Sequence, residues 1–195
     1  MVTFNIISDA APVTDKDQQI GEPNKVTDNL EKGDNKAAAE EFTQLSPAEQ
    51  DRVFASLPSD QKIALASELA SRGEFKLVDR LDDSFTDPGE KMQFQSLVLD
   101  KMINNGDVDK AKEFYDYLIN DPGGPDKDPA FTGAMLLEFM SPENAQILLN
   151  SVEDIDFANE IWKYIGDIDS QHLTLKPVGF SSSDQTQDSL NKPNS

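Results

Sequence analysis

Three helix starts at equal intervals constrain the fold of this chain more than any other feature of its sequence. Ser46, Asp87 and Asp128 each precede a proline, and Asp87 lies midway between the other two. Ser and Asp accept hydrogen bonds from the first free N–H groups of a helix, and proline is favoured at the first helical position. Glu49 and Glu90 follow the first two caps by three residues, as in a capping box. The pattern predicts helices that begin at defined points along the chain.

Residues 46–73 indicate two complete helices and the corner between them. Leu57-Pro58 ends the first helix, and Ser59 starts the second. Gly73 can close the second helix in a left-handed conformation. Apolar residues recur at helical spacing in both helices, namely Val53, Phe54 and Leu57 in the first and Ile63, Ala66, Leu69 and Ala70 in the second.

The same spacing of apolar residues continues through most of the chain. The sequence therefore predicts an all-α fold of about eight or nine short helices, arranged either as stacked helical hairpins, like a solenoid, or as an irregular orthogonal bundle. The other predicted helices start near Asn35, after Gly73, and at Asp87, Asp107, Asp128, Ser141 and either Asp154 or Asp156, the last of them ending near Gly166.

Composition divides the chain into three parts. Residues 1–34 hold Pro and Gly among polar residues without a sustained helical period, so we expect a mostly disordered N-terminal segment. Residues 35–166 form the predicted helical domain. Residues 167–195 are rich in Ser, Asp, Gln and Asn and form a predicted polar C-terminal tail. Both ends are predicted to be disordered.

Two intervals compete as the period of an internal repeat. The cap interval, which carries Ser46 onto Asp87 and Asp87 onto Asp128, also places Val53 over Phe94 and Met135. Its length lies in the range of HEAT and armadillo repeats. The shorter glycine interval instead carries Gly73 onto Gly106. The two periods cannot both be the true one, and the sequence leaves the choice between them open.

Two stretches resemble units of known helical repeat families. NNGDVDKAKEFYDYLIND, residues 104–121, resembles the helical hairpins of tetratricopeptide and pentatricopeptide repeat proteins, in which a Gly-Asp turn precedes a helix with a small residue, here Ala111, and then an aromatic one, here Tyr115. LSPAEQDRVFASLPSDQKIALASEL, residues 45–69, resembles one unit of the superhelical cytoplasmic domain of MgtE-type magnesium transporters. Both resemblances imply an architecture of helical hairpins.

The net charge of −20 limits the partners that this chain can bind. Residues 35–166 alone carry 26 acidic and 12 basic residues, so the predicted domain is itself acidic. Nucleic acids and anionic membrane surfaces are bound mainly through Lys and Arg, so we expect neither as a direct partner. We also expect no membrane insertion, because no run approaches the roughly 18 apolar residues of a membrane span. A partner protein with a basic surface fits this charge.

The residue types exclude several kinds of chemistry. The chain has no Cys and a single His, His172, which rules out cysteine nucleophiles, thiolate zinc sites and sites with two histidines. The loop at residues 120–129 fails as an EF-hand, because Phe131 takes the sixth position from Asp126, where glycine is needed. We therefore expect no catalytic, metal-binding or cofactor-binding residues and no cofactor. The carboxylate clusters fall at helix ends, where capping explains them: Asp79 with Asp82 and Asp83, Asp107 with Asp109, Asp126 with Asp128, and Glu153 with Asp154 and Asp156.

One apolar segment interrupts the polar tail. HLTLKPVGF, residues 172–180, can lie extended along a groove of the helical body, bind a partner protein, or remain part of a flexible tail. The candidate partner-binding residues are Leu173, Leu175, Val178 and Phe180.

These observations predict a non-enzymatic, acidic helical module for protein–protein interaction, as in an adaptor, a regulator or a secreted bacterial effector-like protein. One alternative is a nucleic-acid mimic that binds a basic DNA- or RNA-binding protein, with acids lined along one ridge. Another is a carboxylate-dependent hydrolase with a deep pocket of converging acids. The first residues lack a basic region ahead of their short apolar patch. We therefore expect the protein in the cytoplasm, or exported by a specialised secretion system without a cleavable signal peptide.

Overall fold

The computed structural model describes residues 23–120 and 128–167 of the chain. This part contains ten α-helices and no strand, so the predicted all-α fold is confirmed. The helices are α1 (Pro23–Glu31), α2 (Asn35–Thr43), α3 (Pro47–Ser56), α4 (Ser59–Ser71), α5 (Phe75–Asp82), α6 (Pro88–Asn104), α7 (Val108–Ile119), α8 (Pro129–Glu138), α9 (Pro142–Ser151) and α10 (Ile155–Asp167).

The predicted number of eight or nine helices was too low, and the additional helix is α1. It lies within residues 1–34, the segment predicted to be mostly disordered. Val26 and Leu30 are one helical turn apart and are both buried, which holds α1 against α2. A single apolar pair among polar residues is too short a pattern to reveal a helix from sequence, because its stability comes from tertiary packing.

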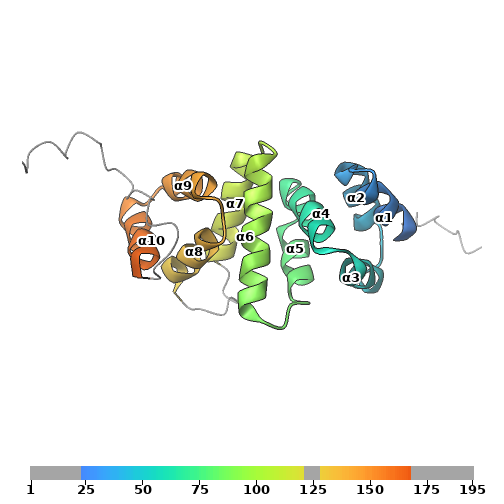
Figure 1. The fold of residues 1–195 in the computed structure, drawn as a ribbon, viewed down its shortest axis with the longest axis horizontal. Helices are drawn as coiled ribbons and strands as arrows, with labels where there is room; N and C mark the ends of the chain where they lie inside the picture. Colours follow the sequence, from blue (N-terminus) through green and yellow to red (C-terminus); the bar gives the residue numbers. More distant parts are fainter. Residues whose placement is uncertain (1–22, 121–127, 168–195) are drawn as a thin grey trace, which may run out of the picture.

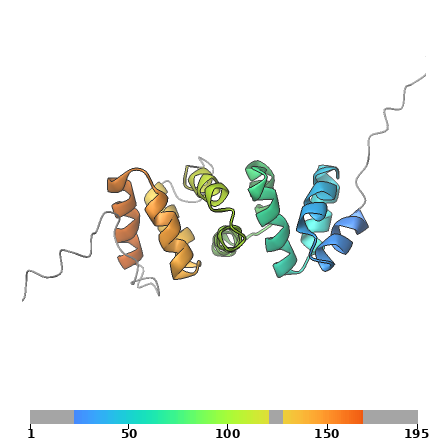
Figure 2. The ribbon, with the colours of Figure 1, turned by 90° about the horizontal axis from the view of Figure 1, so that it is seen from above.

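The helices are stacked along one long axis, with α1 at one end and α10 at the other (Figure 1). A continuous row runs through the molecule, in which α2 packs on α4, α4 on α6, α6 on α8 and α8 on α10. Seen from above, the helices follow one another in sequence order along this axis (Figure 2). Of the two predicted arrangements, the structure is therefore the stack and not the irregular bundle.

Three corners of the stack have the same backbone geometry. Gly33, Gly73 and Gly106 have φ values of 76°, 81° and 91°, a left-handed conformation that glycine adopts without strain. After Gly73, the N–H of Glu74 donates to the carbonyl of Leu69 at 3.0 Å. This is the Schellman bond that ends a helix, and equivalent bonds follow the other two glycines. The predicted left-handed turn at Gly73 is confirmed.

The longer of the two candidate periods is not a structural repeat. The caps of the longer interval start α3, α6 and α8, of which α6 and α8 belong to the continuous row and α3 does not. The glycines of the shorter interval, Gly73 and Gly106, mark equivalent corners, because each follows a helix of the row, α4 or α6, and precedes a helix outside the row, α5 or α7. The shorter interval therefore relates two neighbouring helical hairpins, whereas the longer one relates helix starts only.

The predicted caps are present at the main helix starts. The Glu49 carboxylate accepts hydrogen bonds from the N–H and the hydroxyl of Ser46, at 3.1 and 2.7 Å. Asp87 accepts from the N–H groups of Gly89 and Glu90, at 2.7 and 3.1 Å. Asp128 accepts in the same way at the start of α8, and Asp154, rather than Asp156, does so at the start of α10. α10 continues to Asp167, one residue beyond the predicted end.

Ser141 has a different role from the one its sequence predicts. Its N–H and hydroxyl both donate to Asp100 Oδ1 of α6, at 3.0 and 2.8 Å. The side-chain amide of Asn144 donates to the same oxygen at 2.9 Å. The start of α9 is thus held by a carboxylate from a helix that lies much earlier in the chain.

Candidate functional site

The Asp79, Asp82 and Asp83 cluster forms an ion network with α6. Their carboxylate oxygens lie within 4.8 Å of one another, a spacing that suits a metal ion. Lys91 extends its ammonium group into this cluster, with Nζ 2.7 Å from Asp82, 2.8 Å from Asp83 and 3.5 Å from Asp79. Gln95 donates to the second oxygen of Asp82 at 2.6 Å. The lysine provides the positive charge here, and the network joins α5 to α6.

Burial dominates the ionisation of this network. The side chain of Asp82 is fully buried, which raises its pKa to about 6 although Lys91 and Gln95 oppose the shift. Burial alone would lower the pKa of Lys91, but the carboxylates of Asp82 and Asp83 outweigh it and raise that pKa. The network is therefore a structural joint with a buried carboxyl group.

The other predicted clusters separate into structural roles. Asp107 accepts a hydrogen bond from the Ser71 hydroxyl at 2.8 Å and ties α7 to α4. The Tyr164 hydroxyl donates to Asp128 at 2.6 Å, and this bond is the main reason why the pKa of Asp128 is lowered. Asp126 and most of the loop tested as an EF-hand lie outside the described residues.

An acidic pocket lies between α7 and the corner that joins α9 to α10. It has a volume of about 590 Å³. Ile119 and Val152 are buried beneath it and Phe157 is half-buried, so its floor is apolar. Among the described residues that line it, Lys112 is the only base. The acidic residues of the acidic pocket are Asp109, Glu113, Asp116, Glu153 and Asp154.

Three carboxylates of the acidic pocket, Asp116, Glu153 and Asp154, form no ion pair with a described base, and Asp154 is engaged as the cap of α10. Lys112 pairs loosely with Asp109 at 3.7 Å, and Lys110 pairs with Glu113. No such ion pair joins Asp116 or Glu153 to a described base. Partial burial, and then the nearby charge of Glu153, raise the pKa of Asp116. A positive group placed between these two carboxylates would relieve their repulsion.

The charge of the chain is uneven along the stack. Residues 128–167 contain eight Asp or Glu and a single base, Lys163, and they form the end of the stack beside the acidic pocket.

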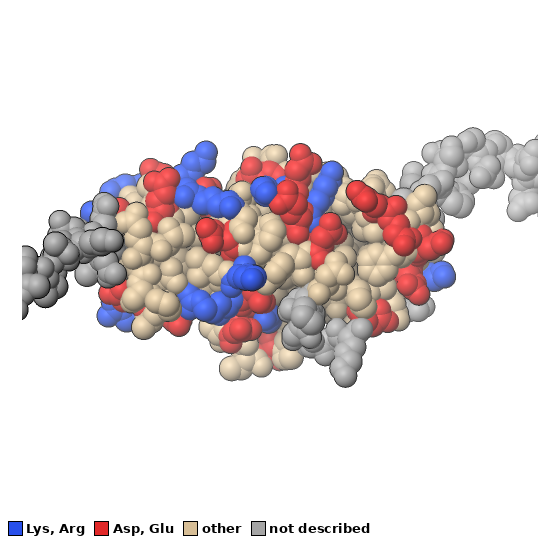
Figure 3. All heavy atoms as spheres, turned by 180° about the vertical axis from the view of Figure 1, so that it is seen from behind, with Lys and Arg blue, Asp and Glu red and all other residues tan. Residues whose placement is uncertain are grey.

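On the face seen in Figure 3, Asp and Glu side chains occur over the whole length with Lys and Arg between them. The acids on this face therefore do not form the continuous ridge that a nucleic-acid mimic predicts.

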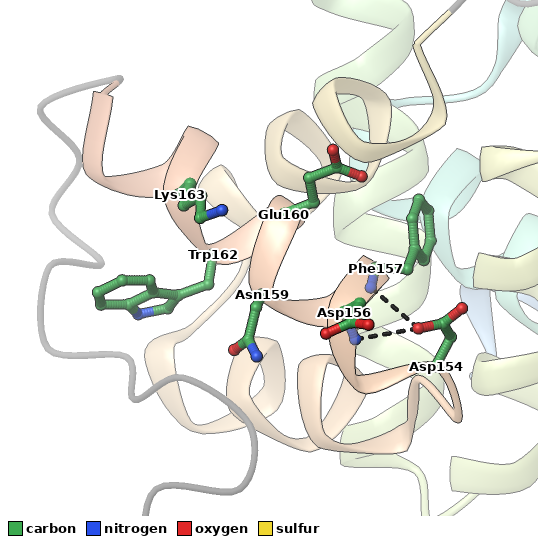
Figure 4. Close-up of a pocket in the computed structure, with 7 residues that line it drawn as sticks. All are labelled: Asp154, Asp156, Phe157, Asn159, Glu160, Trp162 and Lys163. Atoms are coloured by element: carbon green, nitrogen blue, oxygen red, sulfur yellow. Dashed lines mark hydrogen bonds between the residues drawn. The ribbon is translucent and has the colours of Figure 1, made fainter.

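A second hollow, the end hollow, adjoins the acidic pocket on the outer side of α10 (Figure 4). Its volume is about 800 Å³. The two hollows share Asp154 and Phe157. The other residues that line the end hollow are Asp156, Asn159, Glu160, Trp162 and Lys163.

A third hollow, of about 460 Å³, lies between α4 and α6. Its lining is mainly apolar, with Ile63, Phe85 and Leu97 among its residues. Lys62 extends over the ring of Phe85, 5.9 Å from its centroid, and Glu90 lies at the same hollow. The mixed charges here give no preference for a partner of either sign.

The structure locates most of the carboxylate clusters predicted from sequence but not the predicted partner-binding residues. Leu173, Leu175, Val178 and Phe180 lie outside the described residues. Sequence reasoning missed the acidic pocket, since its walls come from four helices whose packing geometry the sequence pattern does not determine. The one signal that could have revealed it is the shortage of Lys and Arg after residue 128.

Comparison of the chain with protein-family models, curated proteins and solved structures found no significant match. Within residues 23–120 and 128–167, no helix has both the length and the apolar character that crossing a membrane requires.

Proposed function

We propose that this chain is a non-enzymatic interaction module that binds a basic segment of another protein in the acidic pocket. The observation that carries this proposal is the pair of carboxylates, Asp116 and Glu153, which face a hollow with an apolar floor and have no base beside them among the described residues. The pocket is large enough for one or two side chains of a partner.

A Lys or Arg side chain matches both parts of this pocket. Its aliphatic stem can lie on Ile119, Val152 and Phe157, while its charged end reaches the carboxylates. Arginine fits better than lysine, because its planar guanidinium donates to two carboxylates at once and packs on an aromatic ring. The shortage of basic residues at residues 128–167 also favours binding at this end of the stack, because the excess negative charge there attracts basic partners.

A charged peptide tests this proposal directly. The probe is an acetylated Leu-Arg-Leu-Arg-Leu peptide, and its control carries citrulline, which keeps the shape of arginine without the charge. We expect calorimetric binding of the arginine peptide only. The Asp116→Asn/Glu153→Gln variant should weaken binding by about tenfold or more, because each charge-assisted hydrogen bond contributes roughly 1.5–3 kcal/mol.

The matched control is Asp60→Asn, which removes an exposed acid at the start of α4, in the other half of the stack. It should leave the affinity unchanged. Equal loss in both variants would mean that overall negative charge and not the acidic pocket binds the peptide. Equal binding of the arginine and citrulline peptides would overturn the proposal.

The same carboxylate pair gives a second, less favoured candidate, a carboxylate-dependent hydrolase. An acid with a raised pKa beside a second carboxyl group is an arrangement that general acid–base catalysis uses. Asp116 and Glu153 are both exposed to water, which favours binding over catalysis. Turnover of chromogenic glycosides, esters or phosphate esters that disappears in Asp116→Asn would establish the hydrolase in place of the module.

A further inference from the structure

The last helix of the stack has an inner and an outer side. Ala158, Ile161 and Ile165 are buried on the inner side, where α10 packs on α8 and α9. The outer side bears the end hollow, with Phe157 and Trp162 at its edges (Figure 4). End units of helical stacks normally present a polar outer face, because no further unit covers them. Both aromatic side chains are half-buried against the core, so each leaves part of its ring accessible at the edge of the end hollow, where a further apolar contact can form.

Asn159 supplies an independent observation in the same hollow. Its side-chain oxygen is buried and has no hydrogen-bond partner among the described residues. A buried acceptor without a partner is costly, and an extended peptide offers backbone N–H groups that can satisfy it.

The chain itself supplies a segment of the right composition at the right place. α10 ends at Asp167, and the segment HLTLKPVGF begins five residues later. An extended residue spans about 3.3 Å, so residues 168–180 reach about 43 Å, which is twice the roughly 20 Å length of α10. The chain can therefore turn back after Asp167 and follow α10 over its full length.

We propose that residues 172–180 bind along the outer side of α10, in the end hollow, and cover this end of the stack. In an extended chain, Leu173 and Leu175 share one side, and Val178 and Phe180 likewise share a side, so each pair offers apolar contacts to the aromatic residues of the end hollow. Lys176 is the only charged residue of the segment, and it approaches the acidic side chains that line this hollow. This assignment is independent of the basic partner proposed for the acidic pocket.

The other end of the chain is a poorer candidate for this position. The described chain starts at α1, at the opposite end of the stack (Figures 1 and 2). The N-terminal segment would have to pass the whole row of helices before it reached α10.

Fluorescence of Trp162 tests the contact in the full chain, because it is the only tryptophan. We expect limited quenching by acrylamide in the native protein. Leu175→Asp and Phe180→Asp should each increase the quenching constant about twofold and shift the emission to longer wavelength, because they expose the indole to water. Ser182→Asp, just beyond the segment, is the matched control and should change neither. Circular dichroism verifies that all variants keep the helical stack.

A spin label provides a second measurement that does not depend on Trp162. The chain has no cysteine, so Ser182→Cys creates a single labelling site. We expect the label to broaden the amide signals of α10 and to leave those of α2 sharp. The Leu175→Asp change in the labelled chain should remove this broadening.

Equal quenching of the native chain and of Leu175→Asp would overturn the proposal, as would broadening spread evenly over the stack. Broadening that depends on concentration, or that appears in a mixture of labelled and isotope-labelled chains, would assign the segment to a second copy and overturn the intrachain contact.

Discussion

Tyr115 is the largest side chain that the core encloses completely, and its hydroxyl has no hydrogen-bond partner among the described residues. It faces Gly133 of α8, where a Cβ atom would lie 2.7 Å from the hydroxyl oxygen and 3.1 Å from Cδ1 of Ile161. Burial raises the pKa of Tyr115, so the hydroxyl stays protonated. α7 and α8 approach each other closely at this point because Gly133 has no side chain.

We expect Gly133→Ala to destabilise the protein by about 1–3 kcal/mol, because overpacking outweighs the gain of about 1 kcal/mol from the better helix former. Tyr115→Phe removes a hydroxyl without a partner and should be neutral or stabilising by up to about 1 kcal/mol. The double variant should recover part of the loss, since the nearest clashing atom is gone. Urea unfolding of the four proteins measures this coupling, and strictly additive effects would refute the contact.

Helices of this stack are joined by polar side chains as well as by the apolar core. Ser71 and Asp107 join α4 to α7, Asp100 joins α6 to the start of α9, and Asp82 with Lys91 joins α5 to α6. Only the last of these joints contains a fully buried ionisable group. The packing of α5 on α6 therefore depends on the protonation of Asp82, and so on pH.

Because the pKa of Asp82 is raised, the stability of the folded chain should depend on pH in a specific way. Its pKa is about 6 in the folded chain and 3.8 ordinarily, so the folded state binds the proton more tightly than the unfolded state. The stability that this group contributes is present below pH 3.8 and is lost as the pH rises through 6. Two pKa units correspond to roughly 3 kcal/mol. Lys91 remains charged over this range because its pKa is raised.

We therefore expect the unfolding free energy of Asp82→Asn to rise relative to that of the native chain, by about 3 kcal/mol, as the pH increases from 4 to 7. Urea unfolding at a series of pH values measures the difference. Asp83→Asn is the matched control, because Asp83 pairs with the same lysine but is exposed, and this variant should not reproduce the gain of Asp82→Asn. A constant difference between Asp82→Asn and the native chain would show that Asp82 titrates normally.

Individual elements were predictable where their signals are local. Ser46, Asp87 and Asp128 start helices as predicted, because a cap and the proline after it act within one turn. Ser141 also starts a helix, but its hydroxyl binds Asp100, a contact that the local sequence does not contain. α1 was missed for the same reason, since Val26 and Leu30 gain their stability from neighbouring helices.

At the scale of the whole molecule, the sequence predicted an all-α fold, with a stack as one of two arrangements, and its acidic charge, but it did not predict the site. The walls of the acidic pocket come from α7, the start of α8, the end of α9 and the start of α10. Which faces of these helices meet depends on the crossing of packed helices, and helical periodicity does not determine that crossing. The charge of the end of the stack was readable by counting residues, whereas the position of Asp116 opposite Glu153 was not.

The charge of the whole stack makes one further prediction, a dependence of stability on salt. With a net charge of −20, the folded chain repels itself more strongly than the expanded unfolded chain does. Salt shortens the range of this repulsion from about 30 Å at 0.01 M to about 10 Å at 0.1 M. Exposed ion pairs are screened too, but each contributes less than about 1 kcal/mol. We expect the melting temperature, followed by far-UV circular dichroism, to rise by a few degrees with NaCl.

Removing charge and adding salt should have the same effect if repulsion is the cause. Asp116→Asn/Glu153→Gln lacks two negative charges that have no basic partner among the described residues, so it should melt higher than the native chain at low salt and respond less to NaCl. Asp83→Asn removes a charge that is paired with Lys91 and should melt lower at low salt. A melting temperature of the native chain that falls with NaCl would mean that ion pairs such as those of Lys91 outweigh the repulsion.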